Sequence, residues 1–252
     1  DVIDITNTDM RNGKGNSYGI YCRQSGNYQT VNINNNELRD VRYGIYASNN
    51  LAYITIDNNN LRNIYRTGIH VQNPLLNRFN ALWIRDNQIR QAKDGIVSID
   101  GSQFVSAPSM FIERNEIRDI DETGIYIGSV SLNATHPVVT GNMLERVNTG
   151  IIMSGYLSPF IERNQIELRN QYTIQQEGIK MENCYIGYIQ DNTIEGDNNN
   201  EAGIKVKSSS NVLVECNTVE STLQGFVFEG QTPFSHWRSE ERRVGKECAT
   251  GC

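Results

Sequence analysis

A six-residue phrase, apolar-x-x-Asn-x-apolar, recurs along almost the whole chain at a spacing of 22 to 28 residues. A Gly-Ile pair follows each copy, and the last copy has Gly-Phe instead. The asparagines of the phrase are Asn36, Asn59, Asn87, Asn115, Asn142, Asn164, Asn192 and Asn217, and a degenerate first copy ends at Met10. A repeat of this length predicts a solenoid, in which each unit packs mainly on its two neighbours.

Within each unit the apolar residues alternate with polar ones, as in Ile54-Ile56, Leu82-Ile84 and Val212-Val214. A period of two residues is typical of β-strands. The connecting segments are rich in Asn and Gly, which disfavours helices between the strands. We therefore predict an all-β chain of about nine coils, each coil of 22–28 residues with three short strands.

This pattern resembles the right-handed, single-stranded parallel β-helix of the pectate-lyase-like superfamily, and the resemblance covers about residues 1 to 230. The strands of that family are called PB1, PB2 and PB3. The resemblance implies that the asparagine of the phrase lies in the tight turn from PB2 to PB3, where Asn tolerates a left-handed backbone. Its amide is then expected to pair with the asparagine of the next coil. The Gly-Ile pair is expected to open PB1, with the isoleucine facing inward.

The repeat stops after Pro233, and the charged, aperiodic stretch RSEERRVGKECATGC follows at residues 238–252. It resembles cloning or adapter sequence rather than evolved protein. We predict a β-helix over residues 1–235, truncated at both ends, and a disordered tail over residues 236–252.

Bulk properties exclude some partners. The net charge is −6, which disfavours a nucleic-acid partner, and no run of 18 apolar residues predicts a membrane span. No metal-binding or cofactor motif occurs, so no cofactor is expected, although a structural or catalytic calcium ion stays open. No signal peptide is visible. The resemblance implies an extracellular, periplasmic or cell-surface location and a monomer or a homotrimer.

On PB1, the residue after the isoleucine is expected to face outward, toward the groove in which the resembling enzymes hold substrate. One predicted cluster there consists of Tyr21, Arg23, Tyr46 and His70, with Asp94 and Asp100 nearby. Aromatic faces and a titratable imidazole suit the binding of a sugar ring and the transfer of a proton. The alternative is that the aromatic rings stack on one another and only stabilise the sheet.

A second predicted cluster consists of Tyr126, Lys180, Glu182, Lys205 and Lys207. Lysines stacked one coil apart repel each other, so an anionic ligand such as a uronate or a sulfated sugar would suit them. We assign candidate catalytic roles to Lys180, Tyr126, Glu182 and His70. Candidate substrate-binding residues are Tyr46, Lys205, Lys207, Arg23 and Tyr21. The alternative is an exposed edge in which glutamates partner the lysines.

Two functions follow. The first is an extracellular β-helix that recognises an acidic polysaccharide along PB1, with lyase, hydrolase or epimerase activity left open. The second is a non-catalytic scaffold or a tailspike-like binding module. The sequence carries no signature of polygalacturonases, alginate epimerases or calcium-dependent pectate lyases, so the reaction stays open. The carboxylates Asp119, Asp121 and Glu122 are a weak candidate for an acid/base pair.

Overall fold

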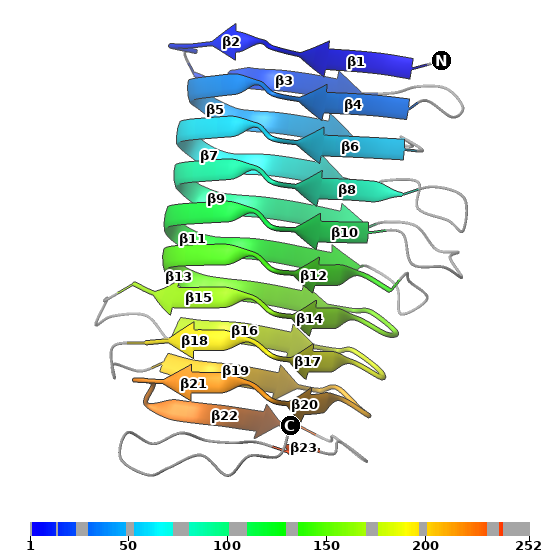
Figure 1. Cartoon of the computed structure of the whole chain (residues 1–252), viewed down its shortest axis with the longest axis vertical. Coiled ribbons are helices and arrows are strands. Elements are labelled where there is room, and N and C mark those ends of the chain that lie inside the picture. The colour runs from blue at the N-terminus through cyan, green and yellow to red at the C-terminus, as the bar shows by residue number, and fades with distance from the viewer. Residues whose placement is uncertain are drawn as a thin grey trace.

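The computed structural model describes residues 2–13, 15–23, 30–48, 53–72, 81–100, 110–129, 136–169, 176–196, 201–230 and 237–238. In these residues the regular elements are β-strands, and no helix is present. Successive coils of the chain stack along the long axis of the molecule, from β1 at one end to β22 and β23 at the other (Figure 1). The predicted all-β solenoid is confirmed.

Two parallel sheets form the walls of the solenoid. The first sheet contains β1 (Val2–Thr6), β4 (Thr30–Asn34), β6 (Tyr53–Asp57), β8 (Leu82–Arg85), β10 (Met110–Glu113), β12 (Val138–Thr140), β14 (Phe160–Glu162), β17 (Tyr188–Gln190), β20 (Leu213–Glu215) and β23 (Trp237–Arg238), in that order. The second contains β2 (Asp9–Met10), β3 (Tyr18–Arg23), β5 (Glu37–Ser48), β7 (Asn60–Gln72), β9 (Gln88–Asp100), β11 (Glu116–Ser129), β13 (Met143–Ser154), β15 (Gln165–Leu168), β16 (Gln176–Glu182), β18 (Thr193–Glu195), β19 (Glu201–Lys207), β21 (Thr218–Glu220) and β22 (Gln224–Glu229).

The prediction of three short strands per coil is wrong for the middle of the rod. There, PB3 and PB1 form one long bent strand in each of β5, β7, β9, β11 and β13. The bend needs a single residue with positive φ, as at Asn63 (φ 53°) and Asp119 (φ 57°), and pairing resumes directly after it. Beyond β13 the second sheet divides into the rows β15–β18–β21 and β16–β19–β22. The predicted count of about nine coils is overstated, and the solenoid has about six turns.

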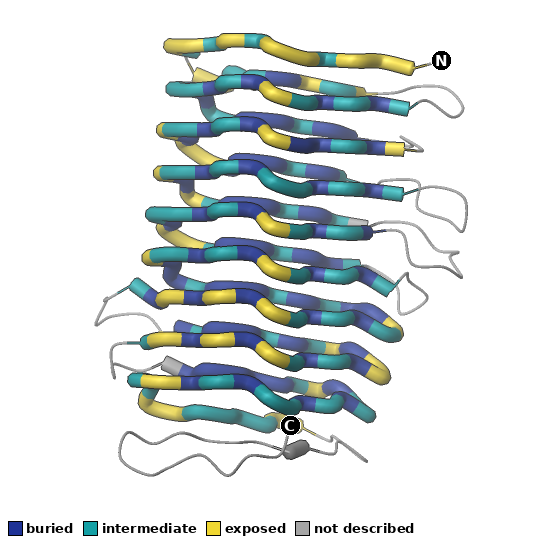
Figure 2. Tube along the Cα trace, in the orientation of Figure 1, coloured by how far each residue is buried: buried dark blue, intermediate teal, exposed yellow. Residues whose placement is uncertain are grey.

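Inward-facing aliphatic side chains fill the space between the two sheets. In Figure 2 buried residues alternate with intermediate and exposed ones along the coils that follow β1 and β2. The predicted inward residues after Gly-Ile, such as Val71, Ile127, Met153 and Met181, are at most 1% exposed. Each coil therefore adds a few residues to one continuous column of Ile, Val and Leu, and burial of this column stabilises the rod.

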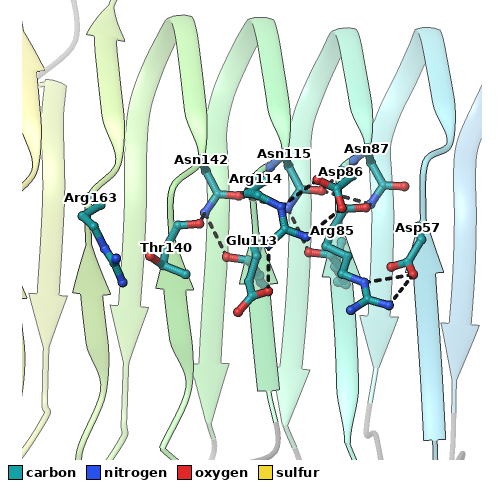
Figure 3. Close-up of polar contacts among 12 residues, drawn as sticks. Asp57, Arg85, Asp86, Asn87, Glu113, Arg114, Asn115, Thr140, Asn142 and Arg163 are labelled. Carbon is teal, nitrogen blue, oxygen red and sulfur yellow. Dashed lines mark hydrogen bonds and ion pairs between the residues drawn. The ribbon is translucent and has the colours of Figure 1, made fainter.

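The predicted asparagine ladder is present. Each ladder asparagine from Asn36 to Asn192 donates a hydrogen bond from its Nδ2 to the Oδ1 of the next ladder asparagine. The N–O distance is 2.9 Å in all seven pairs. Figure 3 shows the Asn87–Asn115–Asn142 part of this row, beside the ion pairs Arg85–Asp57 and Arg114–Asp86. The amide of each ladder residue also donates to a backbone carbonyl of the preceding coil, as from Asn115 to Ile84 O at 2.9 Å.

The expected left-handed backbone is displaced by one position. Positive φ occurs at the residue before each ladder asparagine, for example Asn58 (φ 54°), Asp86 (φ 56°) and Arg114 (φ 51°). The ladder asparagine itself is not among the residues with positive φ. Its amide must point along the rod axis into the core, and the preceding residue makes the turn that aims it there.

The repeated glycines allow adjacent coils to come very close. A Cβ added to Gly95 would lie 2.4 Å from the carbonyl oxygen of Gly124 and 2.8 Å from Cγ2 of Ile117. The absence of a side chain is therefore required here by contact with the next coil. The φ of Gly95 is not positive, so the glycine is not needed for a left-handed backbone.

Several predictions fall partly or wholly outside the described residues. Trp237 and Arg238 lie in the predicted tail but form β23, which pairs with Val214 and Glu215 of β20. Residues 239–252 are outside the described part, so their predicted disorder stays a prediction. Most of the long segments after Gly68, Gly95 and Gly124 are also outside it. In the part of the chain that is described, no helix is long and apolar enough to cross a membrane.

Candidate functional site

The outward residues of PB1 form columns in register, which is the arrangement needed for a shared surface. Backbone pairing joins Tyr21 to Tyr46, Tyr46 to His70, and His70 to Val97. The column continues through Tyr126, Ile152, Lys180 and Lys205 to Val227. Neighbours in a column are about 4.8 Å apart, so only residues within about two coils can act together.

Aromatic rings gather at the N-terminal end of this surface. Tyr46 stacks on His70 with ring centroids 4.8 Å apart and planes within 2°, and on Tyr21 at 5.5 Å and 20°. Tyr18 stacks on Tyr43 at 5.1 Å and 10°. The rings thus pack on one another, as the structural alternative predicted, but Tyr21 remains 49% exposed.

Three arginines accompany these rings. Arg42 and Arg66 each place the guanidinium 5.6 Å from the centre of the Tyr43 ring, within the range of a cation–π contact. Arg23 is exposed at the end of β3. None of the three forms an ion pair with a residue that the structure describes, whereas arginines such as Arg114 and Arg146 do. We call Tyr18, Tyr21, Tyr43, Tyr46, His70, Arg23, Arg42 and Arg66 the aromatic–arginine cluster.

The sequence analysis missed half of this cluster. Tyr18 and Tyr43 lie directly before the repeated glycines. Arg42 and Arg66 each lie two residues before the glycine of their coil. The outward-facing residues were predicted only from the positions that follow the glycine on PB1. A comparison of the positions before it would have found two tyrosines in adjacent coils, because the pairing also aligns Tyr18 with Tyr43.

Burial shifts the pKa of His70 in the cluster, and that of Asp94 beside it, in the direction of the neutral form. Burial, with a smaller effect from the Arg66 charge, lowers the pKa of His70 to about 4, so the imidazole is neutral at neutral pH. Burial, followed by the charge of Glu122, raises the pKa of Asp94, although a hydrogen bond from the backbone of Thr123 opposes this. Asp100 ends β9, and its side chain is outside the described part. The neutral His70 ring therefore packs face to face on Tyr46.

The lysine cluster is internally neutralised. Glu182 Oε2 lies 3.0 Å from Lys180 Nζ, and its Oε1 lies 3.5 Å from Lys207 Nζ. Lys205 is only 7% exposed, and its Nζ contacts Glu229 at 3.0 Å and Glu177 at 3.5 Å. The arrangement is that of the alternative in which glutamates partner the lysines, because each lysine has a carboxylate within ion-pair distance.

These ion pairs also set the protonation of the cluster. Burial tends to raise the pKa of Glu182, but the hydrogen bond from Lys180 and the charges of Lys180 and Lys207 outweigh it and lower the pKa. Burial tends to lower the pKa of Lys205, and its contacts with Glu229 and Glu177 raise it overall. Glu182 thus stays ionised and Lys205 stays protonated at neutral pH. Neither is suited to proton transfer.

Tyr126 does not join the lysines. Its ring lies along its own strand, because a Cβ added at Gly128 would be 2.7 Å from the Tyr126 hydroxyl. The coil carrying Ile152 separates Tyr126 from Lys180. The structure therefore brings together Lys180, Glu182, Lys205 and Lys207 and leaves Tyr126 apart.

The acidic residues proposed as a weak acid/base pair are all bound by cations. Asp119 contacts Arg146 at 2.7 Å, Asp121 contacts Arg169 at 2.7 Å, and Glu122 contacts Lys93 at 3.0 Å. The hydrogen bond from Arg146, opposed by a smaller effect of burial, lowers the pKa of Asp119. In the described part of the chain, no group of three or more His, Cys, Asp or Glu is arranged to hold a metal ion.

Comparison with known proteins identifies the family. The sequence model described as the right handed beta helix region matches residues 18–134 and 75–235. No curated protein and no solved structure matches the chain. Together with the stacked parallel coils and the asparagine ladder, this match shows that the chain belongs to the right-handed β-helix family.

Proposed function

We propose that this β-helix binds an acidic polysaccharide at the aromatic–arginine cluster. The observation that carries the proposal is the set of three arginines, Arg23, Arg42 and Arg66, without an acidic partner among the described residues, beside partly exposed tyrosine rings. Arginine recognises carboxylates and sulfates with paired hydrogen bonds, and tyrosine provides a rigid surface for a sugar ring.

The cluster has the dimensions of a polymer-binding surface rather than of a small pocket. Its members lie on β3, β5 and β7, which are adjacent strands, so the surface spans about 10 Å along the rod. Two or three sugar units of a chain running along the rod would cover it. An extracellular or cell-surface location accords with such a ligand and is part of the proposal.

The lysine cluster supports a non-catalytic role as the second candidate function. Because each lysine already has a carboxylate partner, an anionic sugar would have to displace an ion pair in order to bind there. Catalysis by Lys180 or Glu182 therefore has less support than binding at the aromatic–arginine cluster. A scaffold that binds polysaccharide without turnover fits this arrangement.

The test is a titration of the wild type with polygalacturonate, alginate and chondroitin sulfate, with dextran as the neutral comparison. The Arg42→Gln/Arg66→Gln double variant is expected to lose at least about tenfold in affinity for the acidic polymer. Arg163→Gln is the matched control, because Arg163 is exposed and lies on the tight-turn edge of the rod, and it should keep the wild-type affinity.

Failure of all three acidic polymers to bind, or equal binding by the double variant, would refute the proposal. Each binding polymer is then incubated with the protein and followed by ultraviolet absorbance for unsaturated products and by reducing ends. Turnover would favour the enzyme over the scaffold, and binding without turnover would favour the scaffold.

A further inference from the structure

A second concave surface lies at the corner where the long strands bend. It is an open groove of about 610 Å³, and its lining includes Asn63, Tyr65, Gln91, Lys93, Asp119 and Arg169. We call it the corner groove. Ligand sites commonly have volumes of about 300–1,000 Å³, so the groove has room for one or two sugar units. None of these residues belongs to the aromatic–arginine cluster.

Register places the groove residues in successive coils. Ile64 pairs with Ala92, and Ala92 pairs with Ile120, so their outward neighbours Tyr65, Lys93 and Asp121 follow one another along the rod. Tyr65 is 64% exposed, more than any other large apolar or aromatic residue in the described part of the chain. An exposed phenol ring that stacks on no other ring in the described part of the chain is an available surface for the apolar face of a sugar.

The backbone of the groove is left-handed in three successive coils, with φ of 53° at Asn63, 58° at Gln91 and 57° at Asp119. Asn and Asp tolerate this conformation better than a longer side chain such as glutamine does. The Gln91 side chain is exposed and makes no hydrogen bond with the residues that the structure describes. Its amide can therefore both donate to and accept from a ligand.

The charges of the groove are balanced, which decides the class of ligand. Arg169 Nη1 lies 2.7 Å from Asp121, Lys93 Nζ lies 3.0 Å from Glu122, and Asp119 is held by Arg146. An anionic ligand would compete with these carboxylates for the cations. Sugar hydroxyls can donate to a carboxylate and accept from its cation without breaking the pair. The lining thus suits a neutral ligand rich in hydroxyl groups.

We propose that the corner groove binds a neutral oligosaccharide, with one sugar ring against Tyr65 and hydroxyl groups hydrogen-bonded to Gln91 and to the Lys93–Glu122 pair. This site is separate from the proposed site for acidic polysaccharide and does not depend on it. A protein with both sites would hold two different polymers, or the acidic and neutral segments of one polymer, on neighbouring surfaces of the same rod.

The experiment is calorimetric titration of the full chain with three probes, the linear hexaoses of β-1,4-glucose, α-1,4-glucose and β-1,4-mannose. The wild type is expected to bind at least one of them with a Kd of about 1 mM or tighter. Tyr65→Ala should weaken that binding by about tenfold. Gln91→Asn tolerates the left-handed backbone and should weaken it to a smaller extent.

Two controls make the result specific. Tyr53→Ala removes another exposed tyrosine, 44% exposed on β6 of the first sheet, and should leave binding unchanged. The Arg42→Gln/Arg66→Gln variant should also bind the neutral hexaose normally, even if it loses the acidic polymer. The proposal is overturned if no neutral hexaose binds, if Tyr65→Ala binds as the wild type does, or if the arginine variant loses the neutral ligand instead.

Discussion

Replacement of Asn115 by alanine is expected to destabilise the rod strongly, because this side chain takes part in four hydrogen bonds within the core. Its Nδ2 donates to Asn142 Oδ1 and to Ile84 O, both at 2.9 Å. Its Oδ1 accepts from the backbone N–H of Asn87 at 3.1 Å and from the Asn87 Nδ2 at 2.9 Å. Asn115 itself is only 1% exposed, so water cannot easily replace these partners.

The loss in stability depends on which buried groups lose a hydrogen bond when the Asn115 side chain is removed. After Asn115→Ala, Asn142 Oδ1 still accepts from the Asn115 backbone at 3.0 Å. The Asn87 Nδ2 keeps Ile56 O and Arg85 O. The Asn87 backbone N–H and Ile84 O are left without the Asn115 side chain. The Asn87 N–H left without its acceptor costs about 1–3 kcal/mol, and the lost hydrogen bond to Ile84 O costs about 0.5–1.5 kcal/mol, so the expected loss in the free energy of unfolding is about 1.5–4.5 kcal/mol.

Chemical denaturation monitored by circular dichroism measures this loss of stability. Hydrogen exchange at the backbone N–H of Asn87 shows whether the loss arises at the broken ladder hydrogen bond. That amide should exchange faster in Asn115→Ala by the factor that corresponds to the lost stability. Asn60→Ala is the matched control. Asn60 is half-buried, accepts only from Arg62 among the described residues, and should change stability by no more than about 0.5 kcal/mol.

The reasoning would be refuted by a loss for Asn115→Ala no larger than that for Asn60→Ala. It would also be refuted by a large loss in which the Asn87 amide remains as protected as in the wild type. In the first case the ladder would contribute nothing beyond shape. In the second, the stability would come from packing rather than from the amide bonds.

Three further predictions concern other parts of the rod. Folding lowers the pKa of His70 from 6.5 to about 4, so the unfolded state binds a proton at a higher pH than the folded state does. The free energy of unfolding should therefore fall as the pH drops from 6.5 to about 4. His70→Gln should remove this pH dependence in denaturation curves measured across that range. Gly95→Ala should cost at least about 1–3 kcal/mol by overpacking, whereas Gly141→Asn, at φ 63° with its nearest neighbour 3.7 Å from the added Cβ, should be neutral or stabilising by about 0.5 kcal/mol; melting temperatures of the two variants test this contrast. Lys205→Met leaves the largely buried carboxylate of Glu177 without its cation and should cost about 1–3 kcal/mol in denaturant titrations, while Lys180→Met, whose partner Glu182 keeps Lys207, should cost about 0–1 kcal/mol.

The repeating phrase made the fold predictable because both of its parts have a single structural use. An asparagine buried at one register position meets its copies in the next coils within hydrogen-bond distance, so Asn36 to Asn217 form a row. The alternating apolar residues had to face inward for the same reason of burial. The merging of PB3 and PB1 was not visible, because the αL residue at the bend differs from coil to coil, from Asn63 to Gln91 to Asp119.

The candidate site was less predictable, because the spacing of residues along the sequence does not determine which side chains form ion pairs or ring contacts. The sequence placed Lys180, Glu182, Lys205 and Lys207 side by side but could not show that Glu177, before the glycine, also reaches Lys205. The cation–π contacts of Arg42 and Arg66 depend on how two long side chains fold over Tyr43. Such contacts depend on rotamers, which a column of aligned positions does not specify.

The amide row has a consequence for how a rod of this kind can change in length. Every inner asparagine donates to the asparagine of the coil on one side and accepts from the asparagine of the coil on the other, so these coils present the same contact to their neighbours. Removal or duplication of one whole coil would rejoin an Nδ2 to an Oδ1 without a new type of contact. A deletion of half a coil would leave both groups unmatched. Duplication or deletion of single coils can therefore lengthen or shorten the rod, and its proposed binding surfaces can be moved apart in steps of about 4.8 Å.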